Sequence, residues 1–223
     1  MKYRGVIVVV EGQTEEEFVN ESLRPWLNSQ SVFDVRAIKI RSSRDAKGGN
    51  IGYQKFKNDV TRLLKHEKDV LVTSLIDFFR LPPSFPQYDE ARKITDKVKK
   101  VEFLENAIAA DIDSQRFIPY IQMHEFEALL YTNVEGFKFL PELDLRQIIE
   151  IEAIIQKFPN PEQINDHPET APSKRLKKIY PGYKKVLHGN FIIMENTFSA
   201  LLEKCPRFRH WATSIVSRMK SSI

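Results

Sequence analysis

A run of five aliphatic residues, Val6 to Val10, leads directly into Glu11 and a turn at Gly12. The run is short, continuous and rich in β-branched residues, which is typical of a strand buried on both faces of a parallel sheet. A second run of this kind, DVLVTSLI, spans 69–76 and leads into Asp77. Because both faces of such strands need cover, the two runs predict a sheet with helices packed on either side.

The rest of the first 131 residues alternates between helical and strand patterns. Expected elements are, in chain order, a helix over 15–27, a strand over 33–40, a helix over 56–64, the strand over 69–76, a helix over 91–111, a strand over 117–123 and a helix from residue 127. This order predicts an α/β fold with a sheet of about four mostly parallel strands flanked by helices.

Beyond residue 131 the strand signal fades. Helical patterns cover 145–158, 173–179, 191–204 and 208–219, with proline-containing turns between them. We therefore expect residues 1–132 to form the α/β domain. Residues 133–223 are expected to form a helical C-terminal extension, packed on that domain as part of one compact unit.

Composition limits the class of protein. The chain holds 34 Lys and Arg against 30 Asp and Glu, a formal net charge of +4, which permits a nucleic-acid partner without requiring one. The single cysteine, Cys205, excludes an internal disulfide and a cysteine zinc cluster, and fits a reducing cytoplasm. No signal-peptide pattern precedes Val6, and no apolar run is long enough for a membrane span. We expect a cytoplasmic protein without a membrane partner.

Acidic residues follow three of the predicted strands: Glu11, Asp77 and, after His124, Glu125. The carboxyl ends of parallel strands lie along one edge of a sheet, so these side chains are expected to converge there. Glu15 comes one helical turn after Glu11 and faces the same point. Clustered carboxylates need a cation or shared protons, and hard oxygen ligands suit Mg²⁺ or Mn²⁺. The alternative is that each acid caps a helix or faces solvent.

Five segments carry a family resemblance: VEGQTEEEFV, SLIDFFRLPPSFP, PYIQMHEFEALLY, APSKRLKKIY and CPRFRHW. Together, and in this order over most of the chain, they resemble a Toprim-like bacterial family catalogued as domain of unknown function 4276. The first segment also resembles the first motif of the Toprim fold, the metal-binding domain of topoisomerases, primases and overcoming-lysogenization-defect nucleases. The resemblance implies a Toprim-like sheet and a divalent-metal site.

The resemblance also implies roles for particular residues. Toprim enzymes carry an acidic residue after the first strand, matched by Glu11, and an Asp-x-Asp pair after the third strand. Asp77 matches the first aspartate of that pair, whereas Phe79 stands at the position of the second. This departure weakens any direct copy of the topoisomerase mechanism.

Further metal ligands are implied in the same way. In the overcoming-lysogenization-defect nucleases a second acidic residue, four positions after the first, also holds metal, and it corresponds to Glu15. The resemblance implies that Glu125 or Glu127 supplies the charge that Phe79 lacks. The expected metal ligands are thus Glu11, Glu15, Asp77, Glu125 and Glu127. His124 could act as a base, a ligand or a packing residue, and we favour structural support.

A phosphodiester site also needs cationic groups. Candidates are Lys174 and Arg175 in APSKRLKK, and Lys184 further along the chain. Of these, Lys174 is predicted to be a catalytic residue, together with the acids. Arg44 and Lys47 lie in a loop whose glycine pair would let backbone approach a phosphate. The alternatives are an exposed first helical turn for SKRLKK and an ordinary surface loop around the glycine pair.

These features predict a Mg²⁺- or Mn²⁺-dependent nuclease, or another phosphodiester-processing enzyme, acting on DNA or RNA. The competing interpretations are a non-catalytic Toprim-like module that binds nucleic acid or a partner, and a primase-like synthetic enzyme. The resemblance further implies an ATPase partner protein, since members of this family often sit beside ATPases in bacterial defence loci. The sequence itself has no GxxxxGK[ST] phosphate-binding loop.

Overall fold

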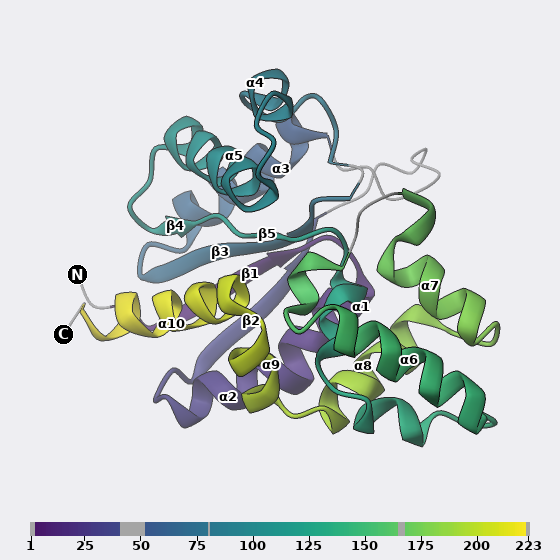
Figure 1. The fold of residues 1–223 in the computed structure, drawn as a ribbon. Coiled ribbons are helices and arrows are strands. Elements are labelled where there is room, and N and C mark those ends of the chain that lie inside the picture. Colours follow the sequence, from purple (N-terminus) through teal and green to yellow (C-terminus); the bar gives the residue numbers. More distant parts are fainter. Residues whose placement is uncertain (1–2, 41–51, 80, 165–167, 222–223) are drawn as a thin grey trace.

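The computed structural model describes residues 3–40, 52–79, 81–164 and 168–221 (Figure 1). Its strands are β1 (Gly5–Val10), β2 (Asp34–Lys39), β3 (Val70–Asp77), β4 (Phe117–Ile118) and β5 (Ile121–Gln122). They form a parallel sheet in the order β2-β1-β3-β4, and β5 also pairs with β3. The predicted fold class, a mostly parallel α/β sheet flanked by helices, is confirmed.

The central strand β1 explains why the sheet is covered on both faces. Its six residues are all buried, and successive side chains point to opposite faces. Val6, Val8 and Val10 join one hydrophobic cluster, whereas Ile7 and Val9 join the other. A strand with no polar face requires two helical layers, and this is what the aliphatic run predicts.

One face of the sheet is covered by α3 (Tyr53–His66), α4 (Tyr88–Arg92) and α5 (Lys97–Ile112) (Figure 1). The sequence predicts a single helix over 91–111, whereas the structure has two. The reason is Asp96, whose carboxylate accepts a hydrogen bond from Lys99 N at 2.9 Å and starts α5 afresh.

The opposite face carries the helical segment that follows β1. It consists of α1 (Gln13–Phe18), a π-helical turn η1 (Val19–Leu23) and α2 (Arg24–Ser29). The predicted helix over 15–27 is therefore present, with a π-helical interruption just ahead of Pro25. Since proline has no N–H and its ring crowds the preceding turn, a widened turn accommodates it.

The fourth predicted strand, over 117–123, is divided at Pro119 into β4 and β5. Ser74 of β3 supports the gap, because its hydroxyl donates to Tyr120 O at 3.1 Å and accepts from Tyr120 N at 2.9 Å. The chain thus stays beside β3 across the proline.

The C-terminal part of the described chain is helical. Its elements are η2 (Phe126–Thr132), η3 (Glu135–Phe139), α6 (Leu145–Lys157), η4 (Pro161–Gln163), η5 (Pro168–Thr170), α7 (Pro172–Ile179), α8 (Lys185–Glu195), α9 (Phe198–Lys204) and α10 (Pro206–Lys220). The region predicted as one helix over 191–204 contains the end of α8 and the whole of α9. The break lies at Thr197, which has a positive φ of 64° and caps the N-terminus of α9. Helix α8 also begins at Lys185, earlier than predicted.

These C-terminal helices share a core with the sheet rather than forming a separate one. Ile192, Phe208 and Trp211 belong to the same buried cluster as Val8 of β1 and Leu71 of β3. Among the described helices, none is both long and apolar enough to cross a bilayer.

A buried hydrogen-bond chain ties α10 to the sheet and gives a test of this packing. Trp211 Nε1 donates to Thr73 Oγ1 at 2.8 Å, and that hydroxyl donates to Ile118 O at 2.6 Å. We expect Thr73→Val to lower the free energy of unfolding by about 1–3 kcal/mol, since it leaves a buried donor and acceptor unpaired. Urea denaturation measures this.

The matched control is Thr213→Val on the exposed face of α10. Its hydroxyl bonds only to backbone carbonyls of its own helix, so the change should stay within about 0.5 kcal/mol. Equal stability of the Thr73→Val variant and the wild type would contradict the packing described above.

Candidate functional site

The carboxyl ends of β1, β3 and β5 meet at one edge of the sheet. Glu11 directly follows β1 and Asp77 ends β3. Asp77 N lies 3.4 Å from Glu11 Oε2 and donates to it, whereas Asp77 Oδ1 accepts from Phe126 N at 2.9 Å. The strand-end acids therefore meet as the parallel topology predicts.

Lys185, the first residue of α8, lies among these acids. Its Nζ is 3.4 Å from Glu15 Oε1, 3.8 Å from Asp77 Oδ2 and 3.3 Å from Glu127 Oε2. The carboxylate side chains of Glu15 and Glu127 are only 4% and 2% exposed, whereas the lysine side chain is 39% exposed. We call Glu11, Glu15, Asp77, Glu127 and Lys185 the acidic site.

Packing of α8 against α1 brings the lysine to this position. Asn190 Nδ2 donates to Thr14 O at 3.2 Å, next to Glu15 in α1. Gly189 lies one helical turn after Lys185 on the same face of α8. The close approach of the two helices delivers a cation from the C-terminal region to acids at the sheet edge.

The turn at His124 separates the roles of the next two glutamates. His124 has a left-handed φ of 62°, and its carbonyl accepts from Phe79 N at 2.6 Å. The chain then enters the 3₁₀ helix η2, in which Glu127 faces Lys185. Glu125 instead points to α7, where its carboxylate accepts from Ser173 N and Ser173 Oγ, both at 3.0 Å.

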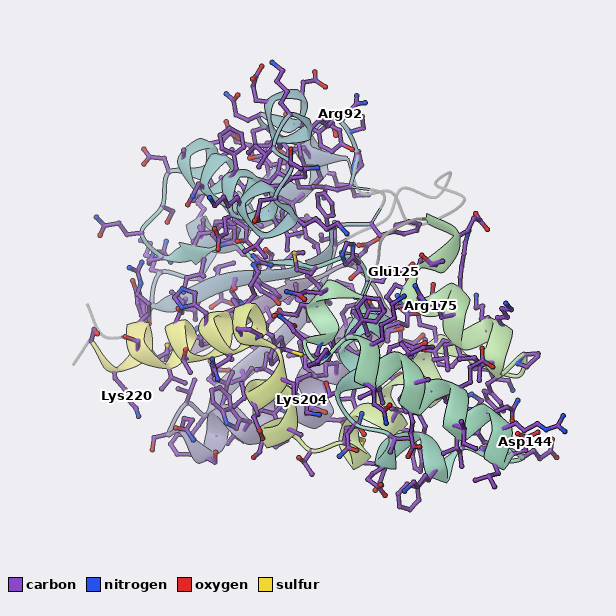
Figure 2. The ribbon with its side chains drawn as sticks, viewed as in Figure 1. Arg92, Glu125, Asp144, Arg175, Lys204 and Lys220 are labelled. Atoms are coloured by element: carbon purple, nitrogen blue, oxygen red, sulfur yellow. The ribbon has the colours of Figure 1, made fainter. Side chains whose placement is uncertain are left out.

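Figure 2 labels Glu125 on the α7 side of the sheet edge. Of the two glutamates that could compensate for Phe79, it is Glu127 that shares Lys185 with Asp77. Glu125 is buried beside it and contributes negative charge that disfavours ionisation of Glu127.

Burial and mutual repulsion shift the ionisation of the acids. Burial, reinforced by the negative charge of Glu15, raises the pKa of Glu11 to about 7. Burial also raises the pKa of Asp77 well above its usual range and raises that of Glu127, in both cases against the opposing charge of Lys185. The site therefore holds more negative groups than one ammonium can neutralise.

The pKa of Lys185 moves in the direction that keeps it charged. Burial lowers the pKa of the ammonium, but the charges of Asp77, Glu127 and Glu15 outweigh burial and raise it above its usual value. Lys185 is accordingly a permanent cation at the centre of the acids.

The donor set of the acidic site suits a hard divalent cation. Within the described ranges, no three His, Cys, Asp or Glu side chains are grouped so that they could hold a metal ion as they stand. The carboxylate oxygens surround an ammonium instead. A cation thus already lies where Mg²⁺ or Mn²⁺ would have oxygen ligands of the preferred kind.

The predicted cationic residues lie apart from this cluster. Lys174 Nζ pairs with Glu169 Oε1 at 2.6 Å, and Arg175 Nε donates to Thr170 O at 2.7 Å. Lys184 is exposed at the N-terminal end of α8. The structure brings none of these three into ion-pair distance of the acids, as far as the described contacts go. Arg44 and Lys47 lie outside the described residues.

Sequence reasoning missed Lys185. The residue is one of two adjacent lysines in PGYKKVLHGN, and the predicted helix in this region began later. The signal was the glycine four residues on, which lets a neighbouring element approach the face of the helix that carries Lys185.

The chain is similar to a solved structure and matches a family model. A solved structure, the C-terminal region of the Xanthomonas campestris pv. campestris OLD protein, is similar at 13% identity, with 98% of this chain and 96% of that chain covered and a TM-score of 0.47. No curated protein matches the chain. The family model described as "Domain of unknown function (DUF4276)" matches residues 10–215. This confirms the resemblance seen in the sequence: the chain belongs to the DUF4276 family.

Proposed function

We propose that this chain is a Mg²⁺- or Mn²⁺-dependent nuclease, or a related phosphodiester-processing enzyme, acting on DNA or RNA. The observation that carries the proposal is the convergence of Glu15, Asp77 and Glu127 on one cationic centre. Buried acids with raised pKa values at the carboxyl edge of a parallel sheet are typical of a functional site.

The acidic site is the proposed metal centre. Glu15, Asp77 and Glu127 would hold the ion, with Glu11 beside Asp77 completing the set. A divalent ion there supplies Lewis-acid polarisation of a phosphoryl oxygen and compensates charge on the attacking and leaving oxygens. Few protein ligands suffice, because Mg²⁺ retains several waters.

The remaining chemistry belongs to side chains of the site. Without a metal ion, burial and the charge of Glu15 raise the pKa of Glu11 to about 7, and a bound divalent ion would lower it and keep this carboxylate ionised as a ligand. Lys185 remains charged and is the nearest described cation for a phosphate oxygen. Lys174, Arg175 and Lys184 are proposed to contact the nucleic-acid backbone further out. A cytoplasmic location, based on the single cysteine, and an ATPase partner in bacterial defence, based on the family resemblance, belong to the same proposal.

One observation favours a second candidate function, a non-catalytic binding module. Lys185 already provides counter-charge to three carboxylates. In that case the ion cluster would be purely structural, and the divalent ion would have no place in it.

The activity of Asp77 variants tests the nuclease proposal. We expect Asp77→Asn to reduce cleavage of DNA or RNA in Mg²⁺ or Mn²⁺ on the order of 100-fold or more, because a charged metal ligand is lost. The amide oxygen still accepts from Phe126 N, so the fold should persist. Asp69→Asn, at an exposed position paired with Arg4, is the matched control. Full activity of both the Asp77→Asn and Glu11→Gln variants would dispose of the proposal.

The Lys185→Met variant distinguishes between the two candidate functions, the metal-dependent enzyme and the non-catalytic module. In EDTA at pH 8 it should lose about 1–3 kcal/mol of stability, less than for a fully buried ion pair because the lysine side chain is 39% exposed. If the acids hold a divalent ion, millimolar Mn²⁺ should restore much of the loss in a thermal melt. Lys174→Met, which breaks a surface pair with Glu169, should change little. No recovery with Mn²⁺ would favour the module.

The pH dependence of stability tests the charge imbalance. The pKa of Glu11 rises from about 4.5 to about 7 on folding, so the folded state binds more protons between these values. Stability of the wild type in EDTA should therefore fall as pH rises from about 4.5 to 7 and stay reduced above it.

Glu11→Gln removes this contribution without changing side-chain shape. The variant should be more stable than the wild type by about 1–3 kcal/mol at pH 8, with the difference vanishing near pH 4. Urea titrations at several pH values measure it, with the exposed Glu21→Gln as control. A pH-independent difference would show that Glu11 keeps an ordinary pKa.

A further inference from the structure

Tyr183 carries a buried hydroxyl that forms no hydrogen bond with the acids or with Lys185. The residue lies between α7 and α8, two positions before Lys185, and is 6% exposed. Its Oη has no hydrogen-bond partner among the described residues. A buried, unpaired hydroxyl opposes folding, and phenylalanine would fill the same space without that penalty.

Gly189 supports the view that this hydroxyl has a use. A Cβ at Gly189 would lie 2.9 Å from Tyr183 Oη and 3.9 Å from the methyl group of Thr14. Glycine weakens a helix interior relative to alanine, yet here it provides the space that the hydroxyl occupies. Since Gly189 is one turn after Lys185, the hydroxyl contacts the face of α8 that turns toward α1 and the acidic site.

Glu127 offers a complementary group. Its Oε2 forms an ion pair with Lys185 at 3.3 Å but has no aligned hydrogen bond among the described residues. Burial, followed by the negative charge of Glu127, raises the pKa of the Tyr183 phenol and keeps it protonated. Tyr183 Oη and Glu127 Oε2 are thus a buried phenolic donor and a buried carboxylate oxygen that each lack an aligned hydrogen bond among the described residues, and the charge of Glu127 acts on the phenol.

We propose that Tyr183 is a positioning residue of the acidic site: when a divalent ion is bound, its hydroxyl hydrogen-bonds Glu127, directly or through one water, and holds that carboxylate toward the ion. The inference rests on the proposed metal centre and adds a group that orients one of its ligands. Removal of a group that orients a metal-binding carboxylate commonly weakens metal affinity.

The test compares two single-atom deletions by titrating Mn²⁺ in a calorimeter, without substrate. Tyr183→Phe should weaken Mn²⁺ affinity about 10–100-fold, while the Tm stays unchanged or rises because no unpaired hydroxyl remains buried. Tyr180→Phe is the matched control, because Tyr180 Oη already donates to Pro141 O at 3.0 Å. That variant should lower the Tm and leave Mn²⁺ affinity unchanged.

A second variant checks the same contact from the α8 side. Gly189→Ala should press on the hydroxyl and weaken Mn²⁺ binding in the wild-type background, but should weaken it little further in the Tyr183→Phe background. Such non-additivity identifies the hydroxyl as the group through which Gly189 acts.

The outcomes separate this inference from the proposed function. If the wild type binds Mn²⁺ and Tyr183→Phe binds it equally well, the positioning role is overturned while the metal centre stands. If Tyr183→Phe lowers the Tm as Tyr180→Phe does, with affinity unchanged, the hydroxyl is structural and the inference is again overturned. If the wild type binds no Mn²⁺, both the metal centre and the role of Tyr183 fall.

Discussion

The ion cluster around Lys185 is the interaction on which the arrangement of this molecule depends. Three carboxylates at the carboxyl edge of the sheet are supplied by α1, β3 and η2, and the compensating ammonium comes from α8. Because Lys185 compensates the charge of these acids, its ion pairs require α8 to pack against α1. Separation of the helices after residue 133 from the sheet would leave buried carboxylates without a cation. The shared hydrophobic core and the ion cluster therefore enforce the same packing.

The charge balance of the acidic site supports the proposed divalent ion. Two unit charges 4 Å apart interact by about 4 kcal/mol at an effective dielectric constant of 20, so each unpaired carboxylate matters. Lys185 carries one positive charge against several acids. Burial first, and then the charges of neighbouring carboxylates, raise the pKa values of Glu11, Asp77 and Glu127. A divalent ion brings twice the charge of the ammonium, and a site with a charge deficit in the folded state favours its binding.

The parts of the site that the sequence predicts are those governed by local pattern. Glu11 and Asp77 end parallel strands, and strand ends of that kind meet whatever the rest of the chain does. Glu125 and Glu127 could not be told apart, because the left-handed residue at 124 and the 3₁₀ helix after it follow neither strand nor helix periodicity. The sequence analysis did not identify Lys185, because its position depends on where α8 begins, and α8 begins at Lys185, whereas the apolar pattern predicts a helix from residue 191.

Glu125 connects the proposed nucleic-acid contacts to the acidic site. Its carboxylate takes the Ser173 N–H at the start of α7, so the amide that would otherwise attract an anion at that helix terminus already has a negative partner. A phosphate near α7 would therefore be contacted by side chains such as Lys174 and Arg175 rather than by the helix terminus. The same bond fixes α7 to the residue two positions before Glu127. The two glutamates thus have different roles: Glu125 positions the basic helix α7, and Glu127 faces the cation at the sheet edge.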